Sequence, residues 1–403
     1  MSLSGTPAPR TVAVLFGGRS LEHDVSIVSG LQVLHALDPD AFRTIPIYVD
    51  QSLKWWVGDD LWDRARFKTG GPDRSRLTEV ALSPAFGTST LVPVSAAPWD
   101  RLLGRVGEIR VDVFLPVIHG TYGEDGALQG LFELGGCAYV GGGILASATG
   151  MNKRVTKVLA AHAGVPVVPW LSCDRSMLTR EPAWLRQLPA RVARHLRWPT
   201  IVKPCNLGSS AGVTVAATPD ELIAGVLKVF EFDSEALIEP FISNRLEINV
   251  AVAGLEAPVA SITEMPVTHQ ESPLTFSEKY KQQGRKSVGS SQGMASAVRV
   301  LDPEQLPEEM RRRAQELAVT VFSTLGCEGI ARIDFLIDAD ANELLFNEIN
   351  TVPGSLAFYL WSAAPHYWTM TELLGHLIER AERVQATKRG LQRTPPADLR
   401  LLT

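Results

Sequence analysis

The segment GIARIDFLIDADANELLFNEINTVPG, residues 329–354, gathers the densest set of charged and amide side chains onto one predicted surface. Two apolar runs flank the polar link 338–343, a pattern that predicts an antiparallel hairpin with its turn near Ala341. Cross-strand partners share a face of a sheet, and side chains alternate with period two. We therefore expect one face to carry two opposed pairs, Asp334 with Glu348 and Arg332 with Asn350.

This face would offer a metal ion two carboxylates and an amide oxygen beside a fixed cation. Hard oxygen ligands of this kind suit Mg²⁺, which binds through one or two carboxylates, water and substrate phosphates and bridges phosphate oxygens during their transfer. The alternative is a solvated hairpin face with a surface Arg–Asp pair. Both interpretations remain open at this point.

Length and composition describe an ordinary globular protein of several domains. The chain has 403 residues, which is too long for one hydrophobic core and favours two or three domains. Hydrophobic residues make up 45% and charged residues 21%, as in soluble globular proteins. With a formal net charge of −5 the chain has no general basic field for nucleic acid, so any polyanion must be bound by a local cluster.

The lack of targeting signals and the scattered cysteines lead us to expect a cytoplasmic protein. No apolar run approaches the roughly 20 residues of a membrane span. The N-terminal sequence MSLSGTPAPR lacks the apolar core of a signal peptide. The four cysteines are scattered without a C-x-x-C pair, which argues against a zinc site and against a disulfide framework. We expect neither a membrane nor a nucleic acid as partner.

Alternating strands and helices up to about residue 150 predict a small parallel sheet with right-handed crossovers. The two clearest strands, 12–16 and 111–117, each run into a glycine-containing loop, which is where open α/β sheets place their ligands. Further elements are expected as helices over 24–37 and 127–134 and a strand over 138–140. Residues 51–108 show no clear pattern, and we interpret them as an elaboration of this domain without chemistry.

A Gly/Ser-rich turn and several lysines mark the second unit. Strands over 198–203 and 213–216 predict a hairpin whose loop PCNLGSSAG can fold N–H groups and hydroxyls over phosphate oxygens. Lys203 at the base of this loop supports a phosphate-covering role, although the order of residues differs from a P-loop. A preceding helix is expected over 146–163, with Lys153 and Lys157 explained as surface lysines.

The third unit combines strands with one long polar stretch. Strands are expected over 247–253 and 259–263, and helices over 303–325 and 369–386. Residues 268–296 are rich in Gln, Ser, Gly and Lys, and a loop of that length in a compact domain is typically a lid, a binding segment or disordered. The basic, proline-containing tail is expected to be mobile.

In its motifs the sequence resembles the D-alanine–D-alanine ligases of the ATP-grasp superfamily. The resemblance spans nearly the whole chain and follows the family order: LFGGRSLEHDVSIVSG, HGTYGEDGALQGLFEL, MNKRVTK, IVKPCNLGSSAGV, LIEPFISNRLEINVAV, EKY, ARIDFLID and EINTVPGS. It implies an α/β, three-domain ATP-grasp fold with an N-terminal parallel-sheet domain. The implied domains are 1–150, 151–245 and 246–403, the last with a lid over 268–296 and a mobile tail.

The resemblance implies a site for ATP and magnesium. Phosphate contacts are implied for Lys153, Lys203, Gly208, Ser210 and, from the lid, Lys279. Glu239 is implied as the acceptor for the adenine amino group, and Glu247 as a ligand of the ribose. Mg²⁺, as two ions with Mn²⁺ as a substitute, is implied at Asp334, Glu348 and Asn350.

The resemblance also implies the substrate contacts. The first amino acid is positioned by Glu22, Ser209 and Tyr280. The tetrahedral intermediate is stabilised by Arg332 and the amide of Gly354, and His119 lies near the substrate and the metal-bound phosphate. The acceptor amino acid is contacted by Ser355, Leu356 and Tyr359.

The implied reaction forms D-alanyl-D-alanine for peptidoglycan precursors. A carboxylate is a poor electrophile, so the first D-alanine attacks the γ-phosphate of ATP to give an acyl phosphate, and the amine of the second D-alanine then attacks the carbonyl. A closing lid keeps water away from the acyl phosphate. The resemblance further implies a homodimer that forms through the first domain.

Two departures from the family pattern leave alternatives open. Pro240 stands where many members carry a lysine, and Tyr359-Leu360 stands where many carry a Ser-Leu pair that helps to hold the acceptor carboxylate. One alternative is a sister ligase with D-lactate, D-serine or another small amino acid as acceptor. The other is a nucleotide-binding relative without catalysis, although every metal and phosphate position is filled.

Overall fold

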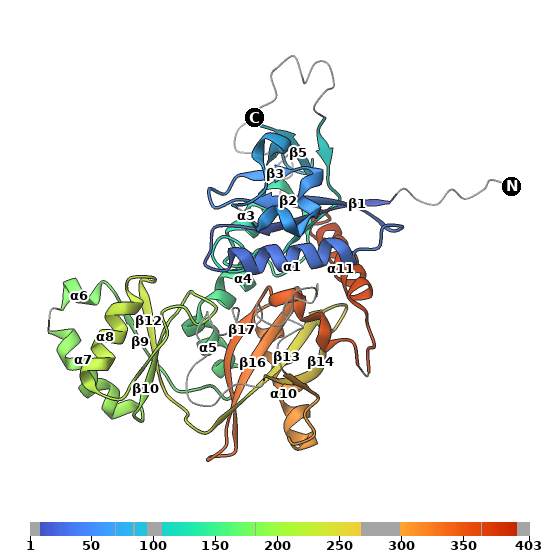
Figure 1. Ribbon diagram of the computed structural model, residues 1–403. Coiled ribbons are helices and arrows are strands. Elements are labelled where there is room, and N and C mark those ends of the chain that lie inside the picture. Colours follow the sequence, from blue (N-terminus) through green and yellow to red (C-terminus); the bar gives the residue numbers. More distant parts are fainter. Residues whose placement is uncertain are drawn as a thin grey trace, which may run out of the picture.

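Three β-sheets with their helices make up the protein (Figure 1). The computed structural model describes residues 9–68, 70–83, 85–94, 107–181, 183–266, 299–363 and 365–392. The predicted lid, 268–296, and the tail beyond residue 392 lie outside these residues. Among the helices of the described part, none is both long and apolar enough to span a bilayer.

The first sheet has eight strands in the order β6-β5-β4-β3-β2-β1-β7-β8. Their bounds are β1 Arg10–Gly17, β2 Phe42–Val49, β3 Trp55–Val57, β4 Thr78–Leu82, β5 Thr90–Pro93, β6 Ile109–Arg110, β7 Val113–Pro116 and β8 Ala138–Tyr139. The four strands β2, β1, β7 and β8 are parallel, as predicted. The poorly patterned segment extends one edge of this parallel core with the antiparallel strands β3 to β6.

Helices cover both faces of the first sheet, because the side chains of its central strand alternate. Val12, Val14 and Phe16 of β1 face two of these helices, α1 (His23–Ala36) and α11 (Met370–Arg389). Ala13 and Leu15 face the opposite side, where α3 (Ala127–Gly135) packs. Short 3₁₀ helices follow β3, at Asp59–Trp62, Arg64–Phe67 and Arg74–Arg76.

The second sheet is antiparallel, with the order β11-β10-β12-β9. Its elements are β9 Leu171–Asp174, α6 Met177–Arg180, α7 Trp184–His195, β10 Thr200–Pro204, β11 Thr214–Ala216, α8 Pro219–Val229 and β12 Glu235–Pro240. Strands β10 and β11 form the predicted hairpin around the Gly/Ser-rich loop. Figure 1 shows this sheet with α6, α7 and α8 set to one side of the other two sheets.

The third sheet, also antiparallel, has the order β15-β14-β13-β16-β17. Its strands are β13 Arg245–Gly254, β14 Pro258–Pro266, β15 Arg299–Leu301, β16 Gly329–Asp338 and β17 Glu343–Asn350. Helix α10 (Glu308–Thr324) packs on one face. The other face turns toward the first sheet and the 3₁₀ segment η6 (Gly354–Leu360), which follows β17 directly.

The hairpin predicted within residues 329–354 is formed by β16 and β17, and its register is confirmed. The opposed pairs are those expected, Asp334 with Glu348 and Arg332 with Asn350. Nearer the turn the pairing is offset by one residue, because a β-bulge leaves Asn347 unpaired. Bulges re-aim side chains next to functional sites. Here Asn347 accepts a hydrogen bond from the ammonium of Lys203 at 3.1 Å, so the bulge links the third sheet to the second.

The single helix predicted over 146–163 is wrong, because two helices occupy this segment. They are α4 (Ile144–Met151) and α5 (Lys153–His162), separated by Asn152 in an extended conformation with φ −90° and ψ 105°. The Asn152 side chain accepts a hydrogen bond from the Val155 N–H and so caps α5. An asparagine that caps a new helix competes with continuation of the old one. As a result α5 packs on β17 and α10, in the core of the third sheet.

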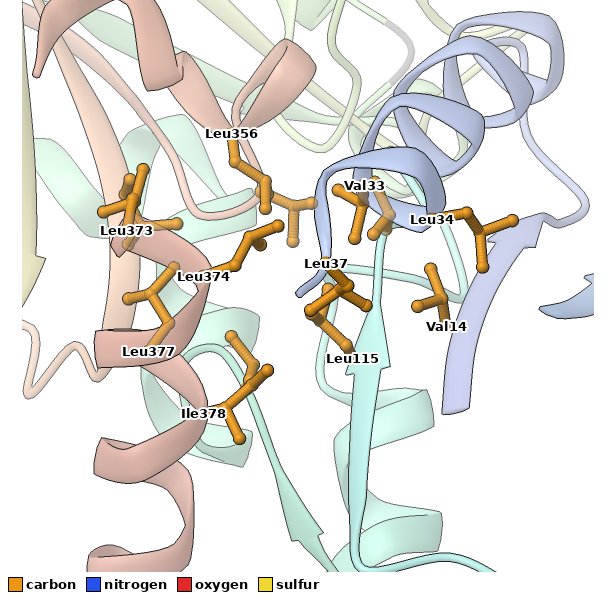
Figure 2. Close-up of a cluster of buried hydrophobic side chains, with 14 of the residues drawn as sticks. Val14, Val33, Leu34, Leu37, Leu115, Leu356, Leu373, Leu374, Leu377 and Ile378 are labelled. Atoms are coloured by element: carbon orange, nitrogen blue, oxygen red, sulfur yellow. The ribbon is translucent and has the colours of Figure 1, made fainter. Parts of the chain in front are cut away.

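A hydrophobic core between the first and third sheets fixes their relative position (Figure 2). It joins side chains from β1, β7, α1, α11 and η6: Val14, Leu115, Val33, Leu34, Leu37, Leu373, Leu374, Leu377, Ile378 and Leu356. Burial of one leucine contributes roughly 1.5–3 kcal/mol. Leu356 therefore fastens the segment that follows the hairpin to the first sheet.

Candidate active site

The third sheet separates its apolar and polar side chains by face. Ile248 and Val250 of β13 and Ala331 and Ile333 of β16 point toward α10 and form an apolar layer with it. Alternate residues lie on the opposite face of a strand. The register aligns four polar side chains of that opposite face in one row across four strands: Glu264, Asn249, Asp334 and Glu348.

Arg332 and Asp334 form an ion pair at the centre of this polar face. The Nε and Nη2 atoms of Arg332 each donate to one carboxylate oxygen at 2.7 Å, and the Asn350 amide donates to the same carboxylate at 3.0 Å. Burial raises the pKa of Asp334 to about 6 despite Arg332, and the carboxylates of Glu247 and Glu348 add to the rise. Negative charge is therefore crowded here in a way that a divalent cation would relieve.

A cleft between the three sheets opens in front of this face. Its lining comes from all three parts of the chain and includes Glu22, Glu124, Lys153, Leu207, Gly208, Glu348 and Asn350. The ammonium of Lys153 donates to the carbonyl of Leu207 at 2.6 Å and lies 3.3 Å from the Glu348 carboxylate. Lys153 thus joins the Gly/Ser-rich loop to the hairpin and places a cation inside the cleft.

Glu22 and Ser209 meet across this cleft, 187 positions apart in the sequence. The Ser209 hydroxyl donates to the carboxylate of Glu22, which stands at the N-terminus of α1. Ser209 and Ser210 have φ angles of +52° and +58°, the left-handed conformation that bends the loop sharply. A Cβ atom at Gly208 would lie 3.0 Å from a carboxylate oxygen of Glu22, so glycine permits this close approach.

A buried cluster of two lysines and one carboxylate lies behind the loop. The carboxylate of Glu239 is 2.7 Å from the ammonium of Lys157 and 2.7 Å from that of Lys203. Burial would raise the pKa of Glu239, but the two ammonium groups lower it below its ordinary value. Burial lowers the pKa of Lys157, which Glu239 opposes. The expectation that Lys157 is a surface lysine is wrong, because its side chain is only 1% exposed.

His119 is held inside a hydrogen-bond network rather than facing open solvent. The Val352 carbonyl can only accept, so Nδ1–H of His119 donates to it at 2.8 Å. Burial lowers the pKa of His119 and so favours its neutral form. Nε2 is then an acceptor for the Ser29 hydroxyl at 3.0 Å, and Ser29 Oγ in turn accepts the Ser355 N–H at 3.1 Å. Both ring nitrogens of His119 are thus engaged with protein groups.

Glu124, which was not predicted from the sequence, links the loop that follows His119 to the loop that follows β17. Its carboxylate accepts the Gly120 N–H at 2.7 Å, the Val352 N–H at 3.0 Å and the Thr351 hydroxyl at 3.3 Å. Burial raises the pKa of Glu124 to about 8, and the nearby carboxylate of Glu22 adds to the rise. The acidic fifth and sixth residues after His119 in HGTYGEDG could have signalled this role, because carboxylates form strong hydrogen bonds with backbone N–H groups.

The segment η6 that follows the hairpin has an unusual backbone. Ser355, Leu356 and Ala357 have φ angles of +52°, +50° and +49°, three consecutive left-handed residues without a glycine. The structure places Leu356 in the hydrophobic core of Figure 2, so only its backbone can face a substrate. Tyr359 is buried, and its hydroxyl donates to Glu264 at 3.2 Å. Gly354 begins η6 beside these residues.

The remaining implied residues fall into two groups. Glu247 lies on β13 of the polar face, opposite Leu336 of β16. Lys279 and Tyr280 lie outside the described residues.

Six residues of the site and its surroundings were not predicted from the sequence: Ser29, Glu124, Lys157, Asn249, Glu264 and Arg299. Strand alternation could have indicated Asn249 and Glu264, since each is a polar residue on the face opposite an apolar layer.

The three sheets and the cleft between them define a protein of the ATP-grasp fold. A family model described as "D-ala D-ala ligase N-terminus" matches residues 11–142, and one described as "D-ala D-ala ligase C-terminus" matches residues 159–379. The chain belongs to the D-alanine–D-alanine ligase family.

Individual relatives agree with this assignment. The D-alanine–D-alanine ligase of Kineococcus radiotolerans is 36% identical, over 94% of this chain and 98% of the relative. The structure of the D-alanine–D-alanine ligase from Coxiella burnetii has a TM-score of 0.76 and 27% identity, with 94% of this chain and 96% of that chain covered. The VanG D-Ala:D-Ser ligase of Enterococcus faecalis is also similar, with a TM-score of 0.70, 26% identity, and coverage of 94% and 99%.

Proposed function

We propose that the protein is an ATP-dependent ligase that joins two D-alanines into D-alanyl-D-alanine and releases ADP and phosphate. The observation that carries this proposal is the cleft, in which Glu22 with Ser209, the cation of Lys153 and the polar hairpin face converge from three sheets. Such convergence suits a reaction that must hold ATP and two amino acids in a reactive arrangement. Family membership points to the same activity.

Charged groups of the chain perform the two steps. Glu22, oriented by Ser209, holds the ammonium of the first D-alanine, whose carboxylate attacks the γ-phosphorus so that ADP leaves and an acyl phosphate forms. Lys153 and Lys203 neutralise phosphate charge. The amine of the second D-alanine then attacks the acyl carbon, phosphate leaves, and Arg332 with the Gly354 N–H stabilises the oxyanion.

The polar hairpin face fits magnesium. No group of three or more His, Cys, Asp or Glu side chains in the described ranges forms a ready-made metal cluster. Asp334, Glu348 and Asn350 supply two carboxylates and an amide, and phosphate oxygens would complete the coordination. Mg²⁺, as two ions or replaced by Mn²⁺, would supply electrostatic stabilisation of the transferred phosphoryl group.

The cellular setting follows from the proposed reaction. The dipeptide would enter peptidoglycan precursor synthesis in the cytoplasm, and the domains would divide as 1–150, 151–245 and 246–403. A homodimer would form through the first domain. Exposed apolar side chains on the neighbouring helices α3 and α4 support this contact: Leu131, Leu134, Ile144 and Leu145.

The identity of the acceptor is a second question, because the similar VanG structure is named as a D-Ala:D-Ser ligase. One experiment tests both points. ATP turnover is measured as phosphate release with a panel of D- and L-amino acids and D-lactate, and products are identified by mass. Phosphate release that depends on D-alanine and a product of the mass of D-alanyl-D-alanine support the proposal. Turnover without any D-alanine in the product would contradict it.

A further inference from the structure

Glu264, Arg299 and Tyr359 form a buried cluster beside the polar face. Glu264 on β14 is only 2% exposed. Its Oε2 accepts from Arg299 Nη1 at 2.8 Å, and its Oε1 accepts from the Tyr359 hydroxyl at 3.2 Å and from the Asn249 amide at 3.1 Å. Three donors on one buried carboxylate hold it in a single position, since loss of any of them leaves part of its charge unsatisfied.

The ring of Tyr359 is held from two directions. Its hydroxyl is bonded to Glu264, and the guanidinium carbon of Arg299 lies 3.9 Å from the ring centroid, in cation–π contact. Arg299 is itself fixed by its ion pair with Glu264. We name these three residues the tyrosine clamp, because two of them immobilise the third.

The tyrosine clamp lies next to Arg332, the residue proposed to meet the oxyanion. Asn249 is the cross-strand neighbour of both Glu264 and Asp334 and donates its amide to Glu264, so Asn249 lies between the clamp and the Arg332–Asp334 pair. The Oδ1 atom of Asn249 is buried and has no hydrogen-bond partner among the described residues. An orphaned acceptor of this kind is commonly satisfied by a bound ligand or water.

We propose that the tyrosine clamp forms one wall of the acceptor subsite, and that Glu264 and Arg299 are positioning residues that set, through Tyr359, which acceptor side chain fits. This inference rests on the proposed ligase function. An immobilised ring is a rigid boundary that admits a methyl group and resists anything larger. Since the Tyr359 hydroxyl is committed to Glu264, it offers no hydrogen bond to a hydroxylated acceptor such as D-serine. The subsite therefore selects small, apolar D-amino acids by shape.

A competition experiment tests the clamp independently of enzyme quantity. The enzyme receives ATP with equal concentrations of D-alanine, D-serine and D-2-aminobutyrate, and tandem mass spectrometry identifies the C-terminal residue of each dipeptide that begins with D-alanine. Loss of folded enzyme lowers all products together, so their ratio reports only acceptor selection. The variants are Arg299→Met, Arg299→Lys, Glu264→Gln and Tyr359→Phe. The control is Arg383→Met, which removes an exposed arginine paired with Glu256.

Arg299→Met and Glu264→Gln are expected to raise the D-2-aminobutyrate to D-alanine product ratio by about tenfold, the lower end of the discrimination that one methylene gives. The D-serine ratio is expected to stay low in Arg299→Met, where the phenol keeps its bond to Glu264, and in Tyr359→Phe, which has no hydroxyl. Arg299→Lys keeps the charge but loses the planar stack and gives an intermediate change. Arg383→Met leaves every ratio unchanged.

Different outcomes would contradict the tyrosine clamp and the proposed ligase function. Wild-type D-2-aminobutyrate to D-alanine ratios in Arg299→Met and Glu264→Gln would overturn the clamp and leave the ligase function intact. If Arg299→Met fails to fold, Arg299→Lys and Glu264→Gln decide the question. Absence of any dipeptide from the wild-type enzyme would overturn the proposed function, and with it the acceptor role of the clamp.

Discussion

Lys157 and Glu239 form an ion pair in which each side chain is only 1% exposed and Nζ lies 2.7 Å from Oε1. The other oxygen of Glu239 is paired with Lys203. In the proposed function Lys203 binds a nucleotide phosphate, and Lys157 alone would then compensate the buried carboxylate. Lys157 would therefore allow Lys203 to change partners.

Lys157→Met is expected to lower both stability and nucleotide affinity. Breaking a buried pair costs about 3–5 kcal/mol of unfolding free energy, with the lower end expected because Lys203 remains. Lys203 would also be retained by Glu239, so the KM for ATP should rise by about tenfold, which corresponds to about 1.4 kcal/mol. Denaturant unfolding and ATP titration measure the two effects. Lys54→Met, at an exposed pair with Glu79, serves as control and should change stability by less than about 1 kcal/mol.

Asp334→Asn and Glu348→Gln are each expected to abolish magnesium-dependent turnover. Stabilisation of transferred phosphoryl charge by a metal is worth several kcal/mol, and about 3 kcal/mol is roughly 100-fold in rate. Turnover is measured across a range of Mg²⁺ concentrations, with circular dichroism to verify folding. Glu343→Gln, at an exposed position on the same strand, should keep normal activity. Near-normal turnover of either variant at ordinary Mg²⁺ would exclude the metal site.

Ser209→Ala should weaken binding of the first D-alanine and spare ATP. The variant removes the hydroxyl that donates to the Glu22 carboxylate, a bond to a charged group worth about 1.5–3 kcal/mol. We expect the KM for the first D-alanine to rise by about tenfold or more. Steady-state kinetics at saturating ATP measure it, with Ser172→Ala on β9 as an exposed control. An equal rise in the KM for ATP would argue against a donor-specific role.

His119 should make stability fall at low pH. Burial holds its pKa below the ordinary 6.5, so the unfolded chain binds a proton that the folded protein resists. The contribution is fully present above pH 6.5 and is lost as the pH falls toward the folded-state pKa, by up to about 1.4 kcal/mol per pH unit. Melting temperatures between pH 5 and 8 should fall more steeply for wild type than for His119→Gln. Parallel curves would contradict this assignment.

Local sequence patterns predicted the hairpin and the register of its opposed pairs, but they did not predict the bulge near its turn. The register at Asp334 and Glu348 was correct, yet the pairing near the turn is offset by the bulge at Asn347. Alternation and turn residues fix which face a side chain takes. They do not reveal the bulge, at which Asn347 accepts a hydrogen bond from Lys203 of another sheet.

Contacts between distant segments escaped prediction. Lysine is ordinarily an exposed residue, and the burial of Lys157 depends on Glu239 and the core of the third sheet. Glu264 and Arg299 are separated by 35 residues, most of them in the polar stretch, and Tyr359 comes 60 residues after Arg299. Neither propensity nor periodicity can bring such residues together, because their pairing is decided by the order of strands in the sheet.

The left-handed conformation of Ser355, Leu356 and Ala357 in η6 is maintained by the rest of the protein. Each such residue is disfavoured by roughly 1–2 kcal/mol, so the same sequence as a free peptide would relax to another conformation. Ser29 and Gln32 of α1 hold it through hydrogen bonds to Ser355. An isolated fragment without the first sheet would lack these hydrogen bonds and is expected to lose this backbone conformation. The conformation of residues near the C-terminal end of the chain therefore depends on a helix near its N-terminal end.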